Sequence, residues 1–196
     1  MDTTFALGES DKEYLLALSR KTISLYISKG ALFQINIESV PPQLKQSCGV
    51  FVSIYKDRLL RGCIGEAVVH KTMCLLVQEM SVQAATNDTR FEELKFGELD
   101  NILIEINLLT PLKKIQHISE FELGRQGIYM KKSGRSGLFL PIVAQETGWN
   151  IEQFLGHCSR DKTGIGWDGW KNAELYTFET LSFGEKEKTI PKMKRI

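Results

Sequence analysis

The run VFVSIYKDRLLRGCIG, residues 50–65, decides how the surrounding chain folds. Residues 50–55 and 59–64 are rich in residues that favour strands, and only the short polar segment 56–58 separates them. Two such runs around a short polar connection are typical of a β-hairpin. We therefore expect two paired strands in this part of the chain.

The second arm of this hairpin reads LRGCIG, residues 60–65. Side chains alternate along a strand, so Arg61 and Cys63 are expected on one face and the bare Gly62 on the other. Two glycines inside a strand usually mark a bulge, or the close approach of another backbone or of a ligand. This arm is therefore the first candidate for a functional site.

Outward from the hairpin, the spacing of apolar residues predicts helices and strands in alternation. The first expected helix begins at the cap Asp11 and stops at Gly30. A second covers 70–85, a short third begins at Pro141, and a fourth runs from the cap Asn150 to residue 157. The expected strands cover 102–109, a hairpin made of 127–132 and 138–140, and 175–183. Helices and mainly antiparallel strands mix without a βαβ rhythm, which indicates the α+β class.

The composition is that of an ordinary globular protein: 196 residues, of which 42% are hydrophobic, with 25 Lys and Arg against 24 Asp and Glu. A chain of this size buries about 70% of its unfolded surface. The formal net charge of +1 argues against a partner such as nucleic acid or an anionic membrane, which needs many excess cations on one face. The excess lies in a basic tail at 185–196, so the body, residues 1–184, is slightly acidic.

The four cysteines are scattered along the chain, without a Cys-x-x-Cys pair; they are Cys48, Cys63, Cys74 and Cys158. The first residues show no basic segment leading into an apolar stretch, as a signal peptide would. No apolar run approaches the roughly 18 residues that a membrane span needs. We therefore expect a cytoplasmic protein with reduced thiols.

Cys63 is the cysteine whose setting suggests chemistry. A guanidinium beside a thiol favours the thiolate and also holds an anionic group of a substrate. Two other interpretations stay open. Cys63 can be a small buried cysteine next to an arginine that reaches solvent, and Gly62-Cys63-Ile64-Gly65 has the Gly-x-x-Gly form of a clamp on a nucleic-acid backbone, although it lacks a basic loop.

At this point the sequence resembles a known family, the AMMECR domain family, also called AmmeMemoRadiSam system protein A. Its signature is the LRGCIG run, which is unbroken here at 60–65. The resemblance continues through Ala84-Ala85, Asp88-x-Arg90-Phe91, Ile104-Glu105-Ile106, Thr110-Pro111, Gly127-Ile128, Gly137-Leu138-Phe139-Leu140-Pro141, Trp149, Phe154-Leu155 and Lys162-x-Gly164. It covers about residues 10–184.

The resemblance implies a fold more than an activity. Members have a single α+β domain, here residues 1–184, made of two subdomains of unequal size. Each subdomain has a mainly antiparallel sheet flanked by helices, and the signature strand lies near the cleft between them. The family's association with Memo-type and radical SAM proteins implies partners in a modification pathway. One departure is Thr163, where members more often have alanine.

A nucleophilic cysteine requires a base, and the candidates are His70, His117 and His157. His70 and Cys74 are four residues apart on an expected helix, but no second pair has the spacing of a zinc site. We therefore expect neither a metal nor a cofactor. Radical SAM chemistry would belong to a partner chain, because closely spaced cysteines are absent from this sequence.

The segment 123–145 has no acidic residue and carries Arg125, Lys131, Lys132 and Arg135. If the hairpin forms there, it is a cationic ribbon. Such a ribbon docks an anionic ligand or an acidic partner, or its lysines simply protect an edge strand from aggregation.

Two functional hypotheses follow. In the first, a cleft containing the signature strand binds a small or peptide-like anionic ligand through Arg61, Gly62 and Gly65, with Cys63 as the nucleophile or redox thiol. In the second, the protein is a non-catalytic interaction module that docks an accessory protein of a Memo and radical SAM modification system.

Overall fold

The computed structural model describes residues 7–186 and has two compact units. Within that range the larger unit contains residues 7–107 and 182–186, and the smaller unit contains residues 108–181. Helices accompany two antiparallel four-stranded sheets, so the α+β class is confirmed. Each unit is described by itself below.

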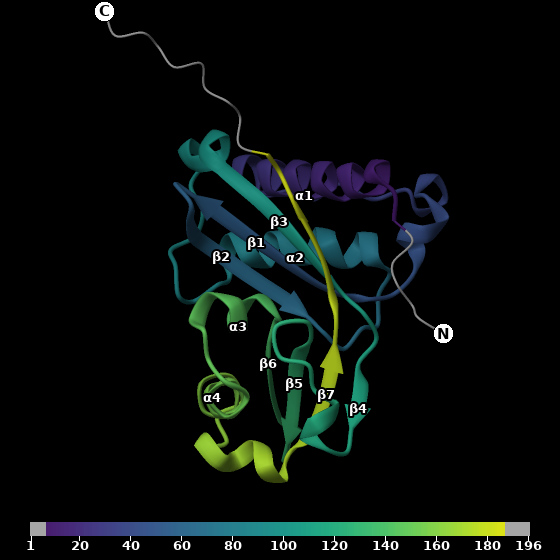
Figure 1. Ribbon diagram of the computed structural model, residues 1–196. Helices are drawn as coiled ribbons and strands as arrows, with labels where there is room; N and C mark the ends of the chain where they lie inside the picture. The colour runs from purple at the N-terminus through teal and green to yellow at the C-terminus, as the bar shows by residue number, and fades with distance from the viewer. Residues whose placement is uncertain (1–6, 187–196) are drawn as a thin grey trace, which may run out of the picture. The chain divides into compact units, whose positions relative to one another are not determined.

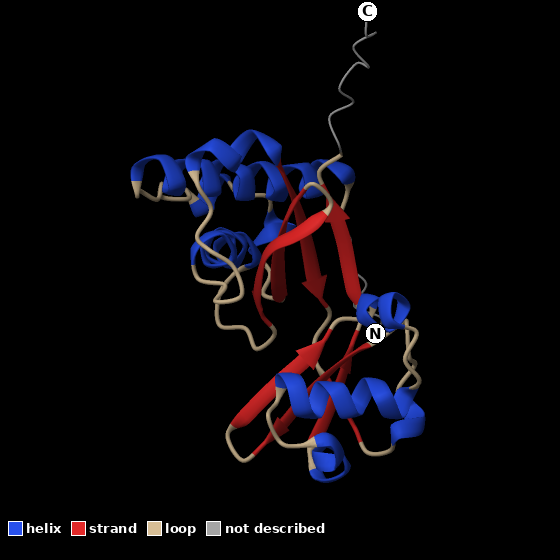
Figure 2. Cartoon of the chain, turned by 90° about the vertical axis from the view of Figure 1, so that its left-hand side faces the viewer, coloured by secondary structure: helices blue, strands red, loops and turns tan. Residues whose placement is uncertain are grey.

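The larger unit is built on a sheet with the strand order β2-β1-β3-β8, called sheet 1 (Figure 1). Its strands are β1 (Gly49–Lys56), β2 (Leu59–Glu66), β3 (Ile102–Leu109) and β8 (Thr180–Gly184). Its helices are α1 (Glu9–Lys29) and α2 (Met73–Thr86), with short 3-10 helices η1 (Ile37–Ser39), η2 (Pro42–Lys45) and η3 (Phe96–Asn101). Both long helices lie on one face of sheet 1 (Figure 2).

Helix α1 starts slightly earlier than the sequence predicts. Gly8 is its N-cap, and the carboxylate of Asp11 accepts the Gly8 backbone N–H at 3.0 Å. Gly30 ends the helix in the left-handed conformation with φ +63°, as predicted. The hydroxyls of Ser19 and Ser81 lie 2.7 Å apart, so the polar groups buried between α1 and α2 satisfy each other.

The predicted hairpin is formed by β1 and β2, and it contains a bulge. Ser53 faces Cys63 and Ile54 faces Gly62, but Tyr55 faces Leu60, so Arg61 has no partner in the ladder. A bulge puts two residues opposite one and breaks the alternation of side chains. Arg61 therefore lies with Gly62 on the face toward α2, and the expectation that it shares a face with Cys63 is wrong.

The start of α2 corrects a second expectation. The helix begins at Met73, with Thr72 as N-cap, and His70 lies in the preceding loop. His70 and Cys74 are therefore not on consecutive turns of one helix, and their four-residue spacing does not place them on one side.

The smaller unit is built on a second sheet, with the strand order β4-β7-β5-β6. Its strands are β4 (Lys113–Ile115), β5 (Gly127–Lys132), β6 (Arg135–Phe139) and β7 (Glu174–Phe178). Its helices are η4 (Ile118–Glu120), α3 (Ile142–Thr147), α4 (Ile151–His157), the π-helix η5 (Cys158–Lys162) and η6 (Trp167–Asn172). Phe154, Ile128 and Met130 are fully buried at the centre of its core.

Local signals in this unit behave as predicted. The Asn150 side chain accepts the Gln153 N–H at 2.9 Å and caps α4. The hydroxyl of Thr163, the departure from the family pattern, is buried and donates to the carbonyl of Cys158 at 3.2 Å. The extra hydroxyl of the threonine is therefore accommodated by a hydrogen bond to the first residue of the π-helix.

The predicted last strand is divided into β7 and β8, which belong to different sheets. The division falls at Glu179, whose backbone pairs with Thr110 instead of with a strand. A continuous apolar alternation over 175–183 does not reveal this change of sheet, because the pattern of side chains is unaffected by it.

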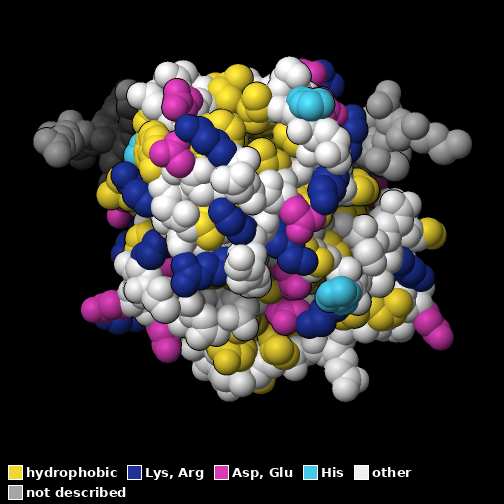
Figure 3. All heavy atoms as spheres, turned by 90° about the horizontal axis from the view of Figure 1, so that it is seen from below, with side chains coloured by type: hydrophobic (Ala, Val, Ile, Leu, Met, Phe, Trp, Pro, Cys, Tyr) yellow, Lys and Arg dark blue, Asp and Glu magenta, His cyan; other side chains and the backbone are white. Residues whose placement is uncertain are grey.

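The predicted cationic ribbon is the β5–β6 hairpin, and its charges are partly engaged. Arg125 lies before the hairpin and pairs with Glu122 and Glu179. Arg135 donates to the carbonyl of Gly164. On the face seen in Figure 3, basic side chains lie among acidic and hydrophobic ones.

The expected basic tail falls mostly outside the described residues. In its first residue, Glu185, the backbone N–H donates to the Ile104 carbonyl, and the carboxylate accepts the Ile104 N–H and forms an ion pair with Arg20 of α1. The larger unit therefore includes at least the first residue of the segment that the charge pattern assigns to the tail.

Candidate functional site

Cys63 differs from the other cysteines in its exposure. Cys48, Cys74 and Cys158 are buried, whereas Cys63 is half-buried. Burial raises the pKa of the Cys48 and Cys158 thiols to about 12. A buried thiol of this kind is inert, so Cys63 is the candidate for thiol chemistry in the described part of the chain.

Ser53 supplies a hydroxyl to Cys63 from the neighbouring strand. Its Oγ donates a hydrogen bond to the Cys63 Sγ at 3.2 Å, and the two residues face each other in the ladder between β1 and β2. Gly62 and Ile54 point toward α2, so Ser53 and Cys63 lie on the opposite face of sheet 1. We call this the outer face. A donor aimed at sulfur favours the thiolate.

Asp88 and Arg90, from the loop after α2, form hydrogen bonds with the edge of β2 at Cys63. The Cys63 N–H donates to Asp88 Oδ2 at 2.8 Å, and Arg90 Nη2 donates to the Cys63 carbonyl at 3.2 Å. Because β2 is an edge strand, these two backbone groups have no neighbouring strand to pair with. The two side chains take the place of a strand and fix the backbone of Cys63.

The Asp88 carboxylate is held ionised by this arrangement. The hydrogen bond from the Arg90 side chain, followed by those from the Cys63 and Arg90 backbone N–H groups, lowers the pKa of Asp88 to about 2. The pKa of Arg90 is raised, first by Asp88 and then by its interaction with the Cys63 side chain. Arg90 is therefore a cation that interacts with the thiol.

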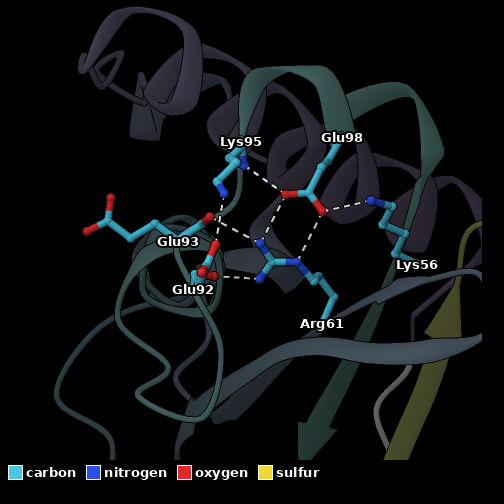
Figure 4. A network of polar contacts seen from close by, with 6 residues as sticks. All are labelled: Lys56, Arg61, Glu92, Glu93, Lys95 and Glu98. Carbon is cyan, nitrogen blue, oxygen red and sulfur yellow. Dashed lines mark hydrogen bonds and ion pairs between the residues drawn. The ribbon is translucent and has the colours of Figure 1, made fainter.

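Arg61 is engaged in a different network, together with Glu98 and Lys56 (Figure 4). Its Nε and Nη2 donate to the two carboxylate oxygens of Glu98 at 3.2 and 3.0 Å. Its Nη1 and Nη2 also donate to the carbonyls of Glu92 and Glu93 at 2.6 and 3.1 Å. Arg61 therefore ties the loop before η3 to the bulge of β2.

Glu98 is the centre of this network. The hydrogen bonds from Arg61, from the Lys95 backbone N–H and from Lys56 Nζ lower its pKa to about 2, in that order of importance. Arg61 and Glu98 are 17% and 15% exposed at their side chains. The pair is a mostly buried, bidentate ion pair, the geometry in which an arginine is most strongly held.

A surface pocket of about 440 Å³ opens on this network. It is lined by Lys56, Arg61, Phe91, Glu92, Lys95 and Glu98. Two exposed apolar side chains belong to neighbours of these residues: Phe96 follows Lys95, and Leu59 pairs with Lys56 in the hairpin.

The two signature glycines are explained by packing inside the larger unit. A Cβ on Gly62 would lie 2.1 Å from the Ala84 carbonyl oxygen of α2, and one on Gly65 would lie 2.1 Å from the Phe51 ring. The sequence predicts a bulge or a close approach here, and β2 contains both. The proposed roles of Gly62, Gly65 and Arg61 in ligand binding stay predictions.

The three histidines are at separate places in the chain. His157 stacks on Trp149 with ring centroids 3.8 Å apart, and its Nδ1 lies 2.9 Å from Asp161 Oδ2. His117 precedes η4, and His70 lies in the loop before α2. Among the described residues, no three side chains of His, Cys, Asp or Glu are grouped as a metal site requires. The base for Cys63 stays a prediction.

Sequence reasoning missed Ser53, Asp88 and Arg90 as parts of the site. Asp88-x-Arg90 is part of the family resemblance, but the sequence assigns it no role at Cys63. The available signal was local: an aspartate that follows a helix and precedes an arginine by two residues is typical of a turn that the side chain caps. Nothing in the sequence indicates that this turn contacts the edge of β2.

The chain is similar to known proteins in sequence and in fold. The family model described as AMMECR1 matches residues 16–183. The Methanopyrus kandleri protein MK0488 is 37% identical over 196 aligned positions, covering 93% of this chain and 92% of that protein. The Methanocaldococcus jannaschii protein MJ0810 is 35% identical, covering 79% and 81%.

A solved structure shows the same fold. The crystal structure of the uncharacterised protein PH0010 from Pyrococcus horikoshii superposes with a TM-score of 0.85 at 30% identity, covering 92% of this chain and 94% of that one. The family resemblance inferred from the signature is therefore confirmed. Among residues 7–186, no helix has both the length and the apolar character to cross a membrane.

Proposed function

The chain belongs to the AMMECR1 family, and we propose that its larger unit binds a small or peptide-like anionic ligand beside Cys63, whose thiolate acts as a nucleophile or redox thiol. One observation carries this proposal. Cys63 is half-buried, accepts a hydrogen bond from Ser53 and interacts with the guanidinium of Arg90. A hydroxyl donor and a cation at one sulfur are the means by which proteins activate cysteines.

The competing interpretation, a small cysteine that merely fills space, fits this geometry less well. The packing cysteines Cys48 and Cys158 are buried, and burial raises their pKa values to about 12 even though Lys162 acts on Cys158. In the proposed reaction the Cys63 sulfur forms a bond to an electrophilic centre of the ligand, and a leaving group departs with its electron pair.

The test is the pH dependence of alkylation in the native protein. Iodoacetamide is added over a range of pH values, and the modified residue is located by peptide mass mapping. We expect Cys63 to react first among the four cysteines and to react below the ordinary thiol pKa of about 8.5. The Cys63→Ser variant is the control, and it should lose the fast phase.

Two outcomes contradict the proposal. Cys63 can be protected in the native state to the same degree as Cys74, which is fully buried. It can also react with the pH profile of an unperturbed thiol. Either result would show that Cys63 is not an activated thiolate.

A second candidate function, docking of an accessory protein, is favoured by the pocket at Arg61 and Glu98. Leu59 and Phe96, whose neighbours line this pocket, are 72% and 69% exposed. Exposed apolar side chains that gather into a patch mark interaction surfaces, and on this hypothesis Leu59 and Phe96 form such a patch with the pocket. On this hypothesis the partner is a Memo-type or radical SAM protein, as the family association implies.

The test of docking is binding of purified Memo-type and radical SAM proteins from the same organism, measured by calorimetry. We expect Leu59→Ser with Phe96→Ser to abolish binding. Ile142→Ser, at a 46% exposed position of the smaller unit, is the matched control and should bind normally. Equal binding by both variants, or no binding by the native protein, contradicts docking at this pocket.

A further inference from the structure

Arg90 has a feature that Arg61 lacks: part of its guanidinium is available to a ligand. Asp88 accepts from Arg90 Nε at 2.9 Å and from Nη2 at 2.6 Å, and Nη2 also donates to the Cys63 carbonyl. Among the described residues, Nη1 donates to no oxygen, and the guanidinium also interacts with the Cys63 side chain. The Arg90 side chain is 49% exposed, whereas that of Asp88 is 5% exposed.

Asp88 and Arg90 differ in burial and in hydrogen bonding, which suggests different roles for them. Asp88 is buried and holds one edge of the guanidinium together with the backbone of Cys63. The Arg90 side chain is half-exposed, and its guanidinium interacts with the Cys63 side chain. Arg61, by contrast, uses all three of its nitrogens within the protein.

We propose that Arg90 is the residue that anchors the anionic group of the ligand beside Cys63, and that Asp88 is the positioning residue that holds Arg90 there. This inference rests on the proposed function of Cys63. It moves the anion-binding role from the arginine inside the signature to one 27 residues beyond the cysteine.

The geometry also selects a class of ligand. The charge of the guanidinium and the N–H groups of Nη1 suit an anionic group such as a carboxylate. Since Arg90 interacts directly with the Cys63 side chain, the carboxylate and the atom attacked by sulfur must be close together in the ligand. We therefore expect a small carboxylic acid, or a peptide carboxylate, with an electrophilic carbon a few bonds away.

Two alkylating reagents test this directly, because they differ in charge and little in size. Iodoacetate carries the carboxylate, and iodoacetamide is its neutral counterpart. In both reactions the Cys63 sulfur bonds to the methylene carbon, the carbon–iodine bond breaks and iodide leaves with the electron pair. Both reagents consume the same thiolate, so the ratio of their rates is independent of the thiol pKa.

The rate ratio of iodoacetate to iodoacetamide at Cys63 is measured against the same ratio for the neutral model thiol N-acetylcysteine amide. We expect the native protein to favour iodoacetate by roughly two- to fivefold relative to the model thiol, as for a partly exposed ion pair. Arg90→Gln should abolish this preference. Arg90→Lys should retain part of it, since the charge remains while the planar fork is lost.

Asp88→Asn should also reduce the preference for iodoacetate while Cys63 still reacts with iodoacetamide, the result expected of a positioning residue. Arg125→Gln is the matched control, because Arg125 is an exposed arginine paired with two glutamates in the smaller unit. It should leave the ratio unchanged. Each variant is checked by its thermal melt.

The outcomes separate this inference from the proposed function. If Cys63 reacts with neither reagent in the native protein, the proposed function fails. If Cys63 reacts readily but the native ratio equals that of the model thiol, or survives in Arg90→Gln, the proposed function stands and the anchoring role of Arg90 is overturned.

Discussion

Two charged networks hold the same strand, and they differ in what they leave exposed. The Arg61–Glu98 network lies on the α2 side of β2, and its arginine is 17% exposed with every nitrogen engaged. The Asp88–Arg90 pair lies at the edge of β2, and its arginine is 49% exposed, with Nη1 donating to no oxygen of the described residues. The first arrangement stabilises the fold, and the second suits a ligand.

The comparison shows why a motif does not locate a site by itself. Arg61 is inside the signature, two residues from Cys63, yet the bulge turns it to the other face. Arg90 is distant in sequence, yet it donates a hydrogen bond to the Cys63 carbonyl and interacts electrostatically with the Cys63 side chain. The number of satisfied donors and the exposure of a side chain distinguish the two roles better than sequence position.

The largest effect on stability is expected from a substitution at Gly62, where β2 packs closely against α2. Gly62→Ala would put a Cβ 2.1 Å from the Ala84 carbonyl, a backbone atom that cannot move alone. We expect a loss of about 3 kcal/mol in the free energy of unfolding. Gly65→Ala meets the half-buried Phe51 side chain at the same distance and should lose less. Urea unfolding of both variants measures the difference, and equal losses contradict this account of Gly62.

Removing the charge of Glu98 should have the next largest effect. Glu98→Gln leaves Arg61 mostly buried without its counter-charge, which should lower the free energy of unfolding by about 2 kcal/mol, less than for a fully buried pair because some solvent reaches it. Urea unfolding measures the loss. A change below about 0.5 kcal/mol, as at ordinary surface positions, would show that Arg61 is not tied to the fold by this network.

The pH dependence of stability tests the same ion pair. The folded pKa of Glu98 is about 2, below its ordinary 4.5, so the unfolded chain binds the proton first. The contribution of Glu98 to stability is therefore complete above pH 4.5 and lost as the pH falls toward 2. The difference in stability between the native protein and Glu98→Gln should shrink over this range. A constant difference contradicts the lowered pKa.

The smallest effect on stability is expected at Arg90. Because its side chain is half-exposed, Arg90→Gln should cost about 1 kcal/mol or less in the free energy of unfolding. Differential scanning calorimetry, with Arg125→Gln as the control, measures this cost. A loss as large as that of Glu98→Gln would mean that the two networks do not differ in the way we describe.

Much of the fold could be predicted because its signals are local. The hairpin at 50–65, the strand 102–109 and the caps Gly30 and Asn150 depend on alternation, β-formers and turn chemistry. The division of 175–183 between two sheets could not be predicted, because it depends on the pairing of Glu179 with Thr110, far away in sequence.

The site could be predicted only in part, because some of its residues are placed by contacts between distant parts of the sequence. Cys63 stands out by its glycines, but its neighbours Ser53 and Arg90 are brought to it by strand register and by a loop that follows α2. The bulge at Arg61 reverses the face that alternation assigns, and only the ladder reveals it. Such long-range contacts leave no periodic signal in the sequence.

The central claim is that Arg90, and not Arg61, is the cation of the Cys63 thiolate. The most direct measurement is the pH profile of Cys63 alkylation by iodoacetamide in Arg90→Gln and in Arg61→Gln, each at a temperature where its melt shows it folded. We predict that Arg90→Gln moves the midpoint to higher pH and that Arg61→Gln leaves it where it is in the native protein. A shift in Arg61→Gln with none in Arg90→Gln would contradict the account.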